Sequence, residues 1–277
     1  MIRGVMSAEP ARPATSRICP LGSASGRAMR RVPAGRIGAM LLSLTFAASS
    51  VPTARAEIPC PIPDDLALHD ISLPEAREQV AADRRLVVLT FGGVHDLDAN
   101  AEAQGATYPA RLQAELEAAL PHIQITVANA SPPGKNSADV AAVLPDLIAK
   151  SGARVVIWGP GGRDVATRLD LGAFRDAVKA GIDATRKSGA DLILLDTTFV
   201  PSPTRMVLIE AYRERLQSVA AANGVPMLRR HGLMRQWSED GTLNLSARDP
   251  AERDLVARHL FACVARSLAT PIAAAVR

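Results

Sequence analysis

Aromatic residues are scarce in this sequence: Phe, Trp and Tyr together make up 3% of its 277 residues. Proteins that stack nucleic-acid bases or long glycans need aromatic platforms, so this scarcity argues against both kinds of surface. The formal net charge of +4 does not change that conclusion. Arginines cluster before Ala56, where acidic residues are almost absent, and the rest of the chain is close to neutral. We therefore expect no nucleic-acid partner.

Cysteine and histidine are also few, with three and five residues. No group of His, Asp and Glu has the spacing of a metal site, so we predict neither a metal ion nor a cofactor. Cys19 belongs to an N-terminal extension, which leaves Cys60 and Cys263 in the rest of the chain. In an oxidising compartment, this pair favours a disulfide between the N-terminal segment and the last helix. Two unrelated buried thiols are the alternative.

The N-terminal apolar run, residues 37–48, is too short to cross a bilayer as a stable helix. It is preceded by Arg30, Arg31 and Arg36 and followed by the small-x-small tripeptide Ala54-Arg55-Ala56. This order is typical of a secretory signal. We therefore predict that the mature protein is periplasmic or secreted and has no membrane span. A retained membrane anchor is the alternative.

The predicted domain organisation has three parts. Residues 1–56 form an N-terminal extension and signal peptide, whose true start is Met1 or Met29. Residues 57–85 form a segment with one helix, tied by Cys60. Residues 86–270 form the main domain, which we expect to be a monomer.

Five short runs rich in Val, Ile and Leu, without strict alternation, predict strands buried on both faces. They are Leu86–Phe91, Ile123–Ala128, Ala153–Trp158, Asp191–Asp196 and Pro226–Arg229. Helical patterns lie between them: one capped by Ser72, then Tyr108–Ala119, Ser137–Lys150, Leu171–Ser188, Arg205–Ala222 and Pro250–Ala269. This alternation predicts a three-layer α/β/α sandwich with a five-stranded parallel sheet. Ligand sites in such sheets lie in the loops that follow the strands.

Three of these loops carry a family resemblance. They read Phe91-Gly92-Gly93-Val94-His95-Asp96, Asn129-Ala130-Ser131-Pro132-Pro133-Gly134-Lys135-Asn136 and Trp158-Gly159-Pro160-Gly161-Gly162-Arg163-Asp164. Together with the order of the strands, they resemble the SGNH hydrolases, also called GDSL esterases and lipases, over roughly residues 86–268. The resemblance implies an SGNH-hydrolase-like (flavodoxin-like) fold and the hydrolysis of esters.

The family performs acyl transfer with four residues: a Ser nucleophile in a Gly-Asp-Ser turn, an oxyanion Gly and Asn, and a His base. Gly92 matches the first glycine of the turn, but Val94 stands at the nucleophile position. Gly134 matches the oxyanion glycine, whereas Arg163 replaces the Asn. The C-terminal Asp-x-x-His motif is missing. Its place is taken either by Asp240–Asn244, with Leu243 or Asn244 at the histidine position, or by the segment near Asp254-Leu255.

Losing the nucleophile or the base of a triad costs on the order of a millionfold in rate. We therefore predict a pseudo-esterase that binds an acylated or anionic small molecule or a glycan without turning it over. The expected binding residues are Gly92, Gly93, His95, Gly134, Gly162, Arg163 and Asp164. Arg163 offers a fixed charge that can hold a carboxylate, sulfate or phosphate. Alternatively, it forms a salt bridge with Asp164, Asp96 or Asp98.

Two other functions remain open from the sequence alone. The chain is an active carboxylester or carbohydrate-ester hydrolase if His95 or Ser131 supplies a displaced catalytic group. It is a structural partner protein if the fold serves only as a scaffold. Family resemblance does not fix a substrate.

Overall fold

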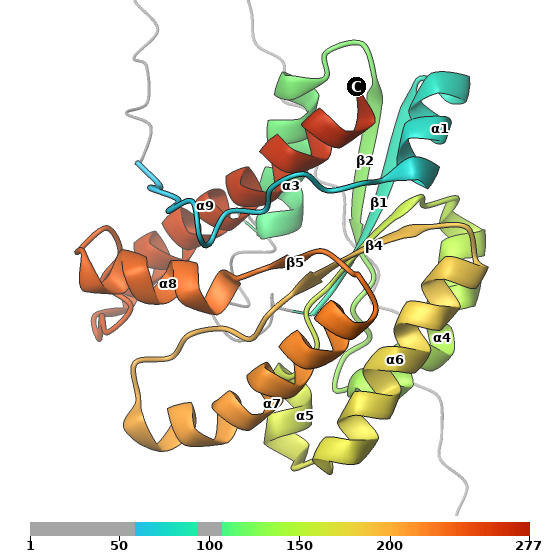
Figure 1. Cartoon of the computed structure of the whole chain (residues 1–277). Coiled ribbons are helices and arrows are strands. Elements are labelled where there is room, and N and C mark those ends of the chain that lie inside the picture. Colours follow the sequence, from blue (N-terminus) through green and yellow to red (C-terminus); the bar gives the residue numbers. More distant parts are fainter. Residues whose placement is uncertain (1–58, 93–106) are drawn as a thin grey trace, which may run out of the picture. The chain divides into compact units, whose positions relative to one another are not determined.

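The computed structural model describes residues 59–92 and 107–277. Its centre is a five-stranded sheet in the order β2-β1-β3-β4-β5, in which every neighbouring pair is parallel (Figure 1). The strands are β1 (Arg85–Phe91), β2 (Gln124–Asn129), β3 (Val155–Trp158), β4 (Asp191–Leu195) and β5 (Met227–Leu228). The predicted α/β class and all five strands are confirmed.

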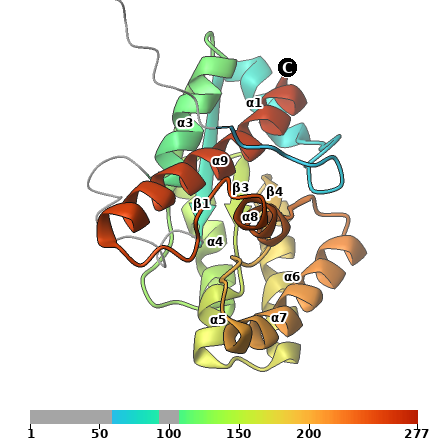
Figure 2. The ribbon, with the colours of Figure 1, turned by 90° about the vertical axis from the view of Figure 1, so that its left-hand side faces the viewer.

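Helices cover both faces of the sheet (Figure 2). They are α1 (Pro74–Asp83), α3 (Tyr108–Ala119), α4 (Ser137–Ser151), α5 (Gly162–Thr167), α6 (Leu171–Lys187), α7 (Pro203–Ala222), α8 (Arg230–Glu239) and α9 (Pro250–Val276). Consecutive strand residues point to opposite faces, so Leu86 and Val88 pack with α1, α3 and α9. Val87 and Leu89 pack instead with α4, α6 and α7. This division explains why the strand sequences are apolar without alternation.

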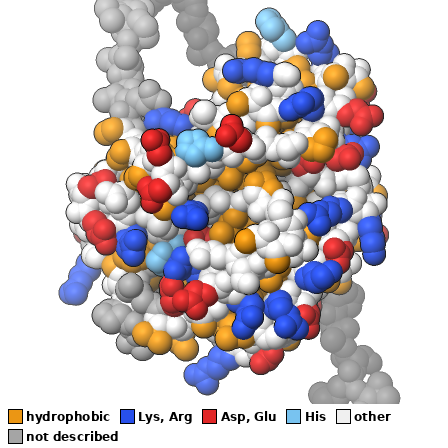
Figure 3. Space-filling view, viewed as in Figure 1, with side chains coloured by type: hydrophobic (Ala, Val, Ile, Leu, Met, Phe, Trp, Pro, Cys, Tyr) orange, Lys and Arg blue, Asp and Glu red, His pale blue; other side chains and the backbone are white. Residues whose placement is uncertain are grey.

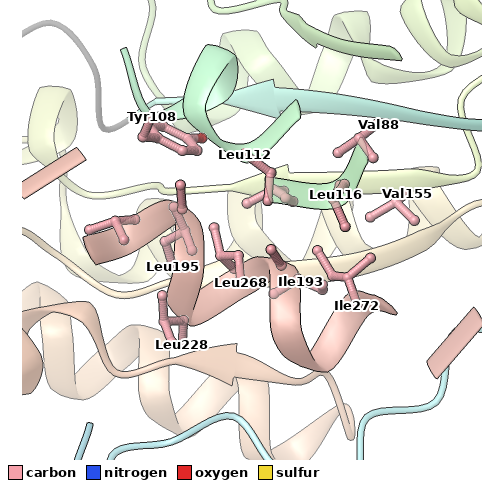
Figure 4. Close-up of a cluster of buried hydrophobic side chains, with 14 of the residues drawn as sticks. Val88, Tyr108, Leu112, Leu116, Val155, Ile193, Leu195, Leu228, Leu268 and Ile272 are labelled. Atoms are coloured by element: carbon pink, nitrogen blue, oxygen red, sulfur yellow. The ribbon is translucent and has the colours of Figure 1, made fainter. Parts of the chain in front are cut away.

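The core between α3, α9 and the sheet is built from branched aliphatic side chains. Figure 4 shows Leu112 and Leu116 of α3 and Leu268 and Ile272 of α9 facing Val88, Val155, Ile193 and Leu195 of the strands. In the described part of the chain, only α9 is long and apolar enough to cross a membrane. However, 67% of its apolar stretch is buried inside the domain, which is the pattern of a core helix.

The expected cap of the first helix by Ser72 is wrong. Leu73 is the N-cap residue of α1 and makes no side-chain cap hydrogen bond. The capping acceptor comes from the sheet, because the Asp191 carboxylate accepts a hydrogen bond from the amide of Ala76 at 2.9 Å. Leu73 is fully buried, so packing determines where this helix begins. The carboxylate of Asp191, which is distant in the sequence, accepts a hydrogen bond from an amide of the first turn that has no partner within the helix.

The last helix is longer than predicted. It continues past Ala269 and through Pro271 to Val276, although proline normally disfavours a helix interior. Ile272 and Val276 are almost fully buried, and this packing outweighs the lost hydrogen bond. The Arg77 Nε donates to the carbonyl of Ala275 at 3.0 Å and caps the final turn.

Cys60 and Cys263 form a disulfide across a sequence separation of 203 residues, as the cysteine count predicted. It fastens the extended N-terminal segment to α9. The Trp237 indole adds a second attachment by donating to the carbonyl of Pro61 at 2.7 Å. The predicted leader, residues 1–56, lies outside the described residues.

Candidate functional site

The carboxyl ends of β1 and β3 approach each other so closely that only glycine fits between them. Gly92 follows β1 with φ +74°, and a Cβ atom on it would lie 2.4 Å from the carbonyl oxygen of Gly159. The amide of Gly159 in turn donates to the carbonyl of Phe91 at 2.8 Å. This close contact and hydrogen bond fix the positions of the two strand ends, from which the first and third loops begin.

A cavity of about 220 Å³ lies over these strand ends, between the loops that follow β1, β2 and β3. Five of the predicted site residues line it: Gly92, Gly134, Gly162, Arg163 and Asp164. The structure therefore brings these five residues together at the edge of the sheet where the sequence placed them. Gly93, Val94 and His95, which we also expected there, lie outside the described residues.

Asp164 holds the second and third loops together. Its carboxylate accepts hydrogen bonds from the amide of Ser137 at 2.9 Å, from the Ser137 hydroxyl at 2.6 Å and from the amide of Gly161 at 2.9 Å. The residue is 1% exposed. Because these donors occupy both of its oxygens, we assign Asp164 the role of positioning the cavity wall, whereas the sequence suggested ligand binding.

Arg163 lies on the cavity rim beside the second loop. Its Nε donates to the carbonyl oxygen of Gly134 at 3.2 Å, and the side chain is exposed. Within residues 59–92 and 107–277 it forms no ion pair. The proposed salt bridge to Asp164 is therefore wrong, because that carboxylate is taken by Ser137 and Gly161. Asp96 and Asp98 lie outside the described residues.

Ser131 also lines the cavity, and its hydroxyl braces the first loop. The Oγ atom accepts a hydrogen bond from the amide of Gly92 at 2.7 Å. Its own amide donates to Oδ1 of Asn129 at 3.1 Å, which fixes the turn after β2. Of the histidines that the structure describes, none forms a hydrogen bond with this hydroxyl. In the described part of the chain, the hydrogen bonds of Ser131 therefore join the first and second loops.

The C-terminal residues that stand where the family has its histidine have structural roles. Leu243 precedes α9, is 1% exposed and packs in the core, while its amide donates to the carbonyl of Trp237 at 2.8 Å. The Asn244 amide group donates to the Glu252 carboxylate at 2.7 Å. Asp254 and Leu255 lie within α9, as does His259.

A buried polar cluster beside the end of β4 was not predicted. Oδ1 of Asp196 accepts a hydrogen bond from the amide of His231 at 2.6 Å, and its carbonyl accepts from Nε of Arg230 at 3.0 Å. All three residues are buried. Burial raises the pKa of the Asp196 carboxyl from 3.8 to about 6 and lowers the pKa of His231. The sequence signal that could have identified it is an aspartate at the carboxyl end of a predicted strand.

This cluster makes the stability of the fold depend on pH. Because the pKa of Asp196 is higher in the folded state, its protonated form favours folding below about pH 4, and that contribution is lost as the pH rises through 6. We expect Asp196→Asn, which keeps an oxygen acceptor for His231, to raise the free energy of unfolding by about 2 kcal/mol at pH 7.5. At pH 4 the difference should vanish. Urea unfolding of both proteins at pH 4, 5.5 and 7.5 measures this, and a gain that stays constant with pH contradicts it.

Comparisons with known proteins agree with this architecture. The sequence profile of the Non-GDSL lipase-like family matches residues 59–277. A variant of Axe2, an acetyl-xylooligosaccharide esterase of Geobacillus stearothermophilus, is similar in structure, with a TM-score of 0.53, 16% identity and coverage of 68% of this chain and 93% of that one.

A lipase/acylhydrolase of Enterococcus faecalis is a second structural neighbour, with a TM-score of 0.48 and 18% identity. The alignment covers 68% of this chain and 96% of that one. A comparison with curated proteins found no match. The family profile covers most of the chain, and the chain therefore belongs to the Non-GDSL lipase-like family.

Proposed function

We propose that this protein is an exported, non-catalytic relative of the SGNH esterases, whose cleft binds an acylated or anionic small molecule or a glycan. The observation that carries the proposal is Val94, an aliphatic residue at the position where the family has its serine nucleophile. A side chain without a hydroxyl cannot attack an acyl carbon. The candidate positions for the family's histidine support the same proposal, because Leu243 is packed in the core, Asn244 donates to Glu252, and Asp254 and Leu255 lie within α9.

The oxyanion position is also altered in a way that favours binding over catalysis. An asparagine there donates a neutral hydrogen bond to charge that develops during the reaction. Arg163 instead carries a permanent charge, and its Nε is held by the carbonyl of Gly134. A permanent cation can also hold a ligand that is already an anion in its ground state, and that interaction contributes to affinity.

Two observations support export. The disulfide between Cys60 and Cys263 is of a kind that persists in oxidising compartments. The family profile begins at residue 59, shortly after the predicted cleavage site at Ala56. The folded domain therefore starts where the leader is expected to end.

A panel of p-nitrophenyl esters with acyl chains from acetyl to decanoyl, together with acetylated xylo-oligosaccharides, tests the absence of catalysis. We expect no hydrolysis above the rate in buffer, since both nucleophile and base are missing. The competing function is an ester hydrolase with rearranged catalytic groups, and the position of Ser131 in the cavity wall favours it. Turnover that disappears in Ser131→Ala or His95→Ala, with the fold intact, would establish that alternative.

A further inference from the structure

A groove lies between the N-terminal segment, residues 59–73, and α9. Its volume is about 500 Å³, and it shares no lining residue with the cavity at the ends of β1 and β3. The segment starts beside α9 at the disulfide between Cys60 and Cys263. It leads into α1, where Arg77 donates to the carbonyl of Ala275 near the end of α9. The segment and the helix therefore run in the same direction, with the groove between them (Figure 1).

A gap in the hydrogen bonds of α9 adjoins this groove. Pro271 lies inside the helix and has no amide N–H, so the carbonyl of Ser267, four residues earlier, lacks its usual donor. Both residues line the groove, and residues four apart lie on the same face of a helix. Ser267 is 3% exposed, which leaves little room for water to replace the donor. Buried backbone carbonyls are nearly always paired, so the gap indicates a donor from a bound molecule.

The groove is lined by charged side chains of both signs. Asp64 and Asp70 line it from the N-terminal segment and Arg77 lines it from α1, and in the described part of the chain none of the three forms an ion pair. Arg266 lines it too, but Glu115 lies 3.7 Å away and compensates its charge. Figure 3 shows acidic side chains on this face where the segment crosses α9. These charges suit a ligand that carries both an ammonium and a carboxylate group.

The spacing along α9 sets the length of such a ligand. The Nε of Arg77 is held by the carbonyl of Ala275 at 3.0 Å, so the terminal nitrogens of the guanidinium remain for a carboxylate. Ser267 precedes Ala275 by eight residues, which corresponds to about 12 Å along the helix axis. An extended tripeptide spans about 10 Å, and a hydrogen bond at each end covers the remainder. The apolar side chains that line the groove are Ile62, Ala67, Leu68, Ile71, Ala274 and Ala275.

We propose that the groove between the N-terminal segment and α9 is a second binding site, and that it takes a short peptide with free termini, about three residues long. The ammonium group of the peptide donates to the carbonyl of Ser267 and is attracted by the carboxylates of Asp64 and Asp70. The carboxylate of the peptide binds the guanidinium of Arg77. This site goes beyond the function proposed for the cavity and does not depend on it.

Calorimetric titration of the full chain with the tripeptide Ala-Leu-Ala tests the ligand class. We expect saturable binding. Acetylation of the amino terminus or amidation of the carboxyl terminus should each weaken it at least about fivefold, because each removes one charge-assisted contact. Free alanine is too short to reach both ends of the groove and should bind at least about tenfold more weakly. A tripeptide that does not bind, or that binds equally well with both termini blocked, would overturn the inference.

Pro271→Ala tests the role of the carbonyl. The substitution restores an amide N–H to α9, which pairs the carbonyl of Ser267 within the helix and removes it from the ligand. We expect the affinity for Ala-Leu-Ala to fall at least about fivefold, while the midpoint of thermal unfolding does not fall. Pro145→Ala is the matched control, since Pro145 also lies inside a helix, α4, but does not line the groove. Equal affinities of the two variants would contradict the inference.

The charges and the location are tested by two further changes. Asp64→Asn with Asp70→Asn should weaken Ala-Leu-Ala binding at least about fivefold. Asp146→Asn with Asp176→Asn, at exposed positions of α4 and α6, makes the same change of charge elsewhere and should have no effect. Arg163→Met should also leave the affinity unchanged, because Arg163 lines only the cavity. Loss of tripeptide binding in Arg163→Met would place the peptide in the cavity and overturn the second site.

Discussion

Replacing both disulfide cysteines, Cys60→Ala with Cys263→Ala, is expected to lower the free energy of unfolding by about 5 kcal/mol. The bond closes a loop that spans a sequence separation of 203 residues, nearly the whole described domain. In the chain-entropy model, such a cross-link mainly restricts the unfolded chain, and the effect grows slowly with loop length. Urea unfolding of the variant and the wild type without reductant measures the difference.

Reductant provides the control for this prediction. The wild type should approach the stability of the double variant when a thiol reductant is present, whereas the variant should not change. Cys263 is fully buried, so a small part of the loss in the variant comes from the removed sulfur. A wild-type protein that is equally stable with and without reductant would contradict the structural role of the bond.

The second large effect is expected at Asp164. Asp164→Ala removes the acceptor of three buried donors, and each unpaired donor costs about 1–3 kcal/mol. We therefore expect a loss of roughly 3 kcal/mol or more in the free energy of unfolding. The donors belong to Ser137 at the start of α4 and to Gly161 in the third loop. Losing them should also separate these loops and abolish ligand binding in the cavity.

Asp170→Ala is the matched control. Asp170 caps α6 and accepts hydrogen bonds from the amides of Gly172 at 2.8 Å and Ala173 at 3.0 Å, but it is exposed. Water can replace the lost acceptor there, so the loss of stability should be much smaller. Equal losses of stability for the two variants in thermal and urea unfolding would contradict the claim that the hydrogen bonds of Asp164 to Ser137 and Gly161 stabilise the fold.

The strands were predictable because their signal is local. Runs such as those at β1 and β3 are apolar on both faces, and that pattern depends on composition alone. The short helix α5 and the polar helix α8 were missed, since neither has a long apolar stripe. The start of α1 was misplaced for a different reason: its cap comes from Asp191, a residue distant in the sequence.

The same distinction applies to the site. That Gly92, Gly134 and Arg163 lie around one cavity was predictable, because the loops that follow parallel strands meet at one edge of the sheet. The role of Asp164 could not be predicted, because it depends on which atoms the tertiary structure brings within hydrogen-bonding distance. A sequence motif can place a residue at a site without showing whether its side chain faces the ligand or supports the wall.

The absence of a catalytic nucleophile is the central claim, and reaction with a fluorophosphonate tests it most directly. These reagents form a stable covalent adduct with an activated serine, whatever its position in the chain. The folded protein is incubated with the probe and its intact mass is then measured. We expect an unchanged mass, because Val94 has no hydroxyl and no described histidine forms a hydrogen bond with Ser131. A one-to-one adduct located on any serine of the folded protein would contradict the account.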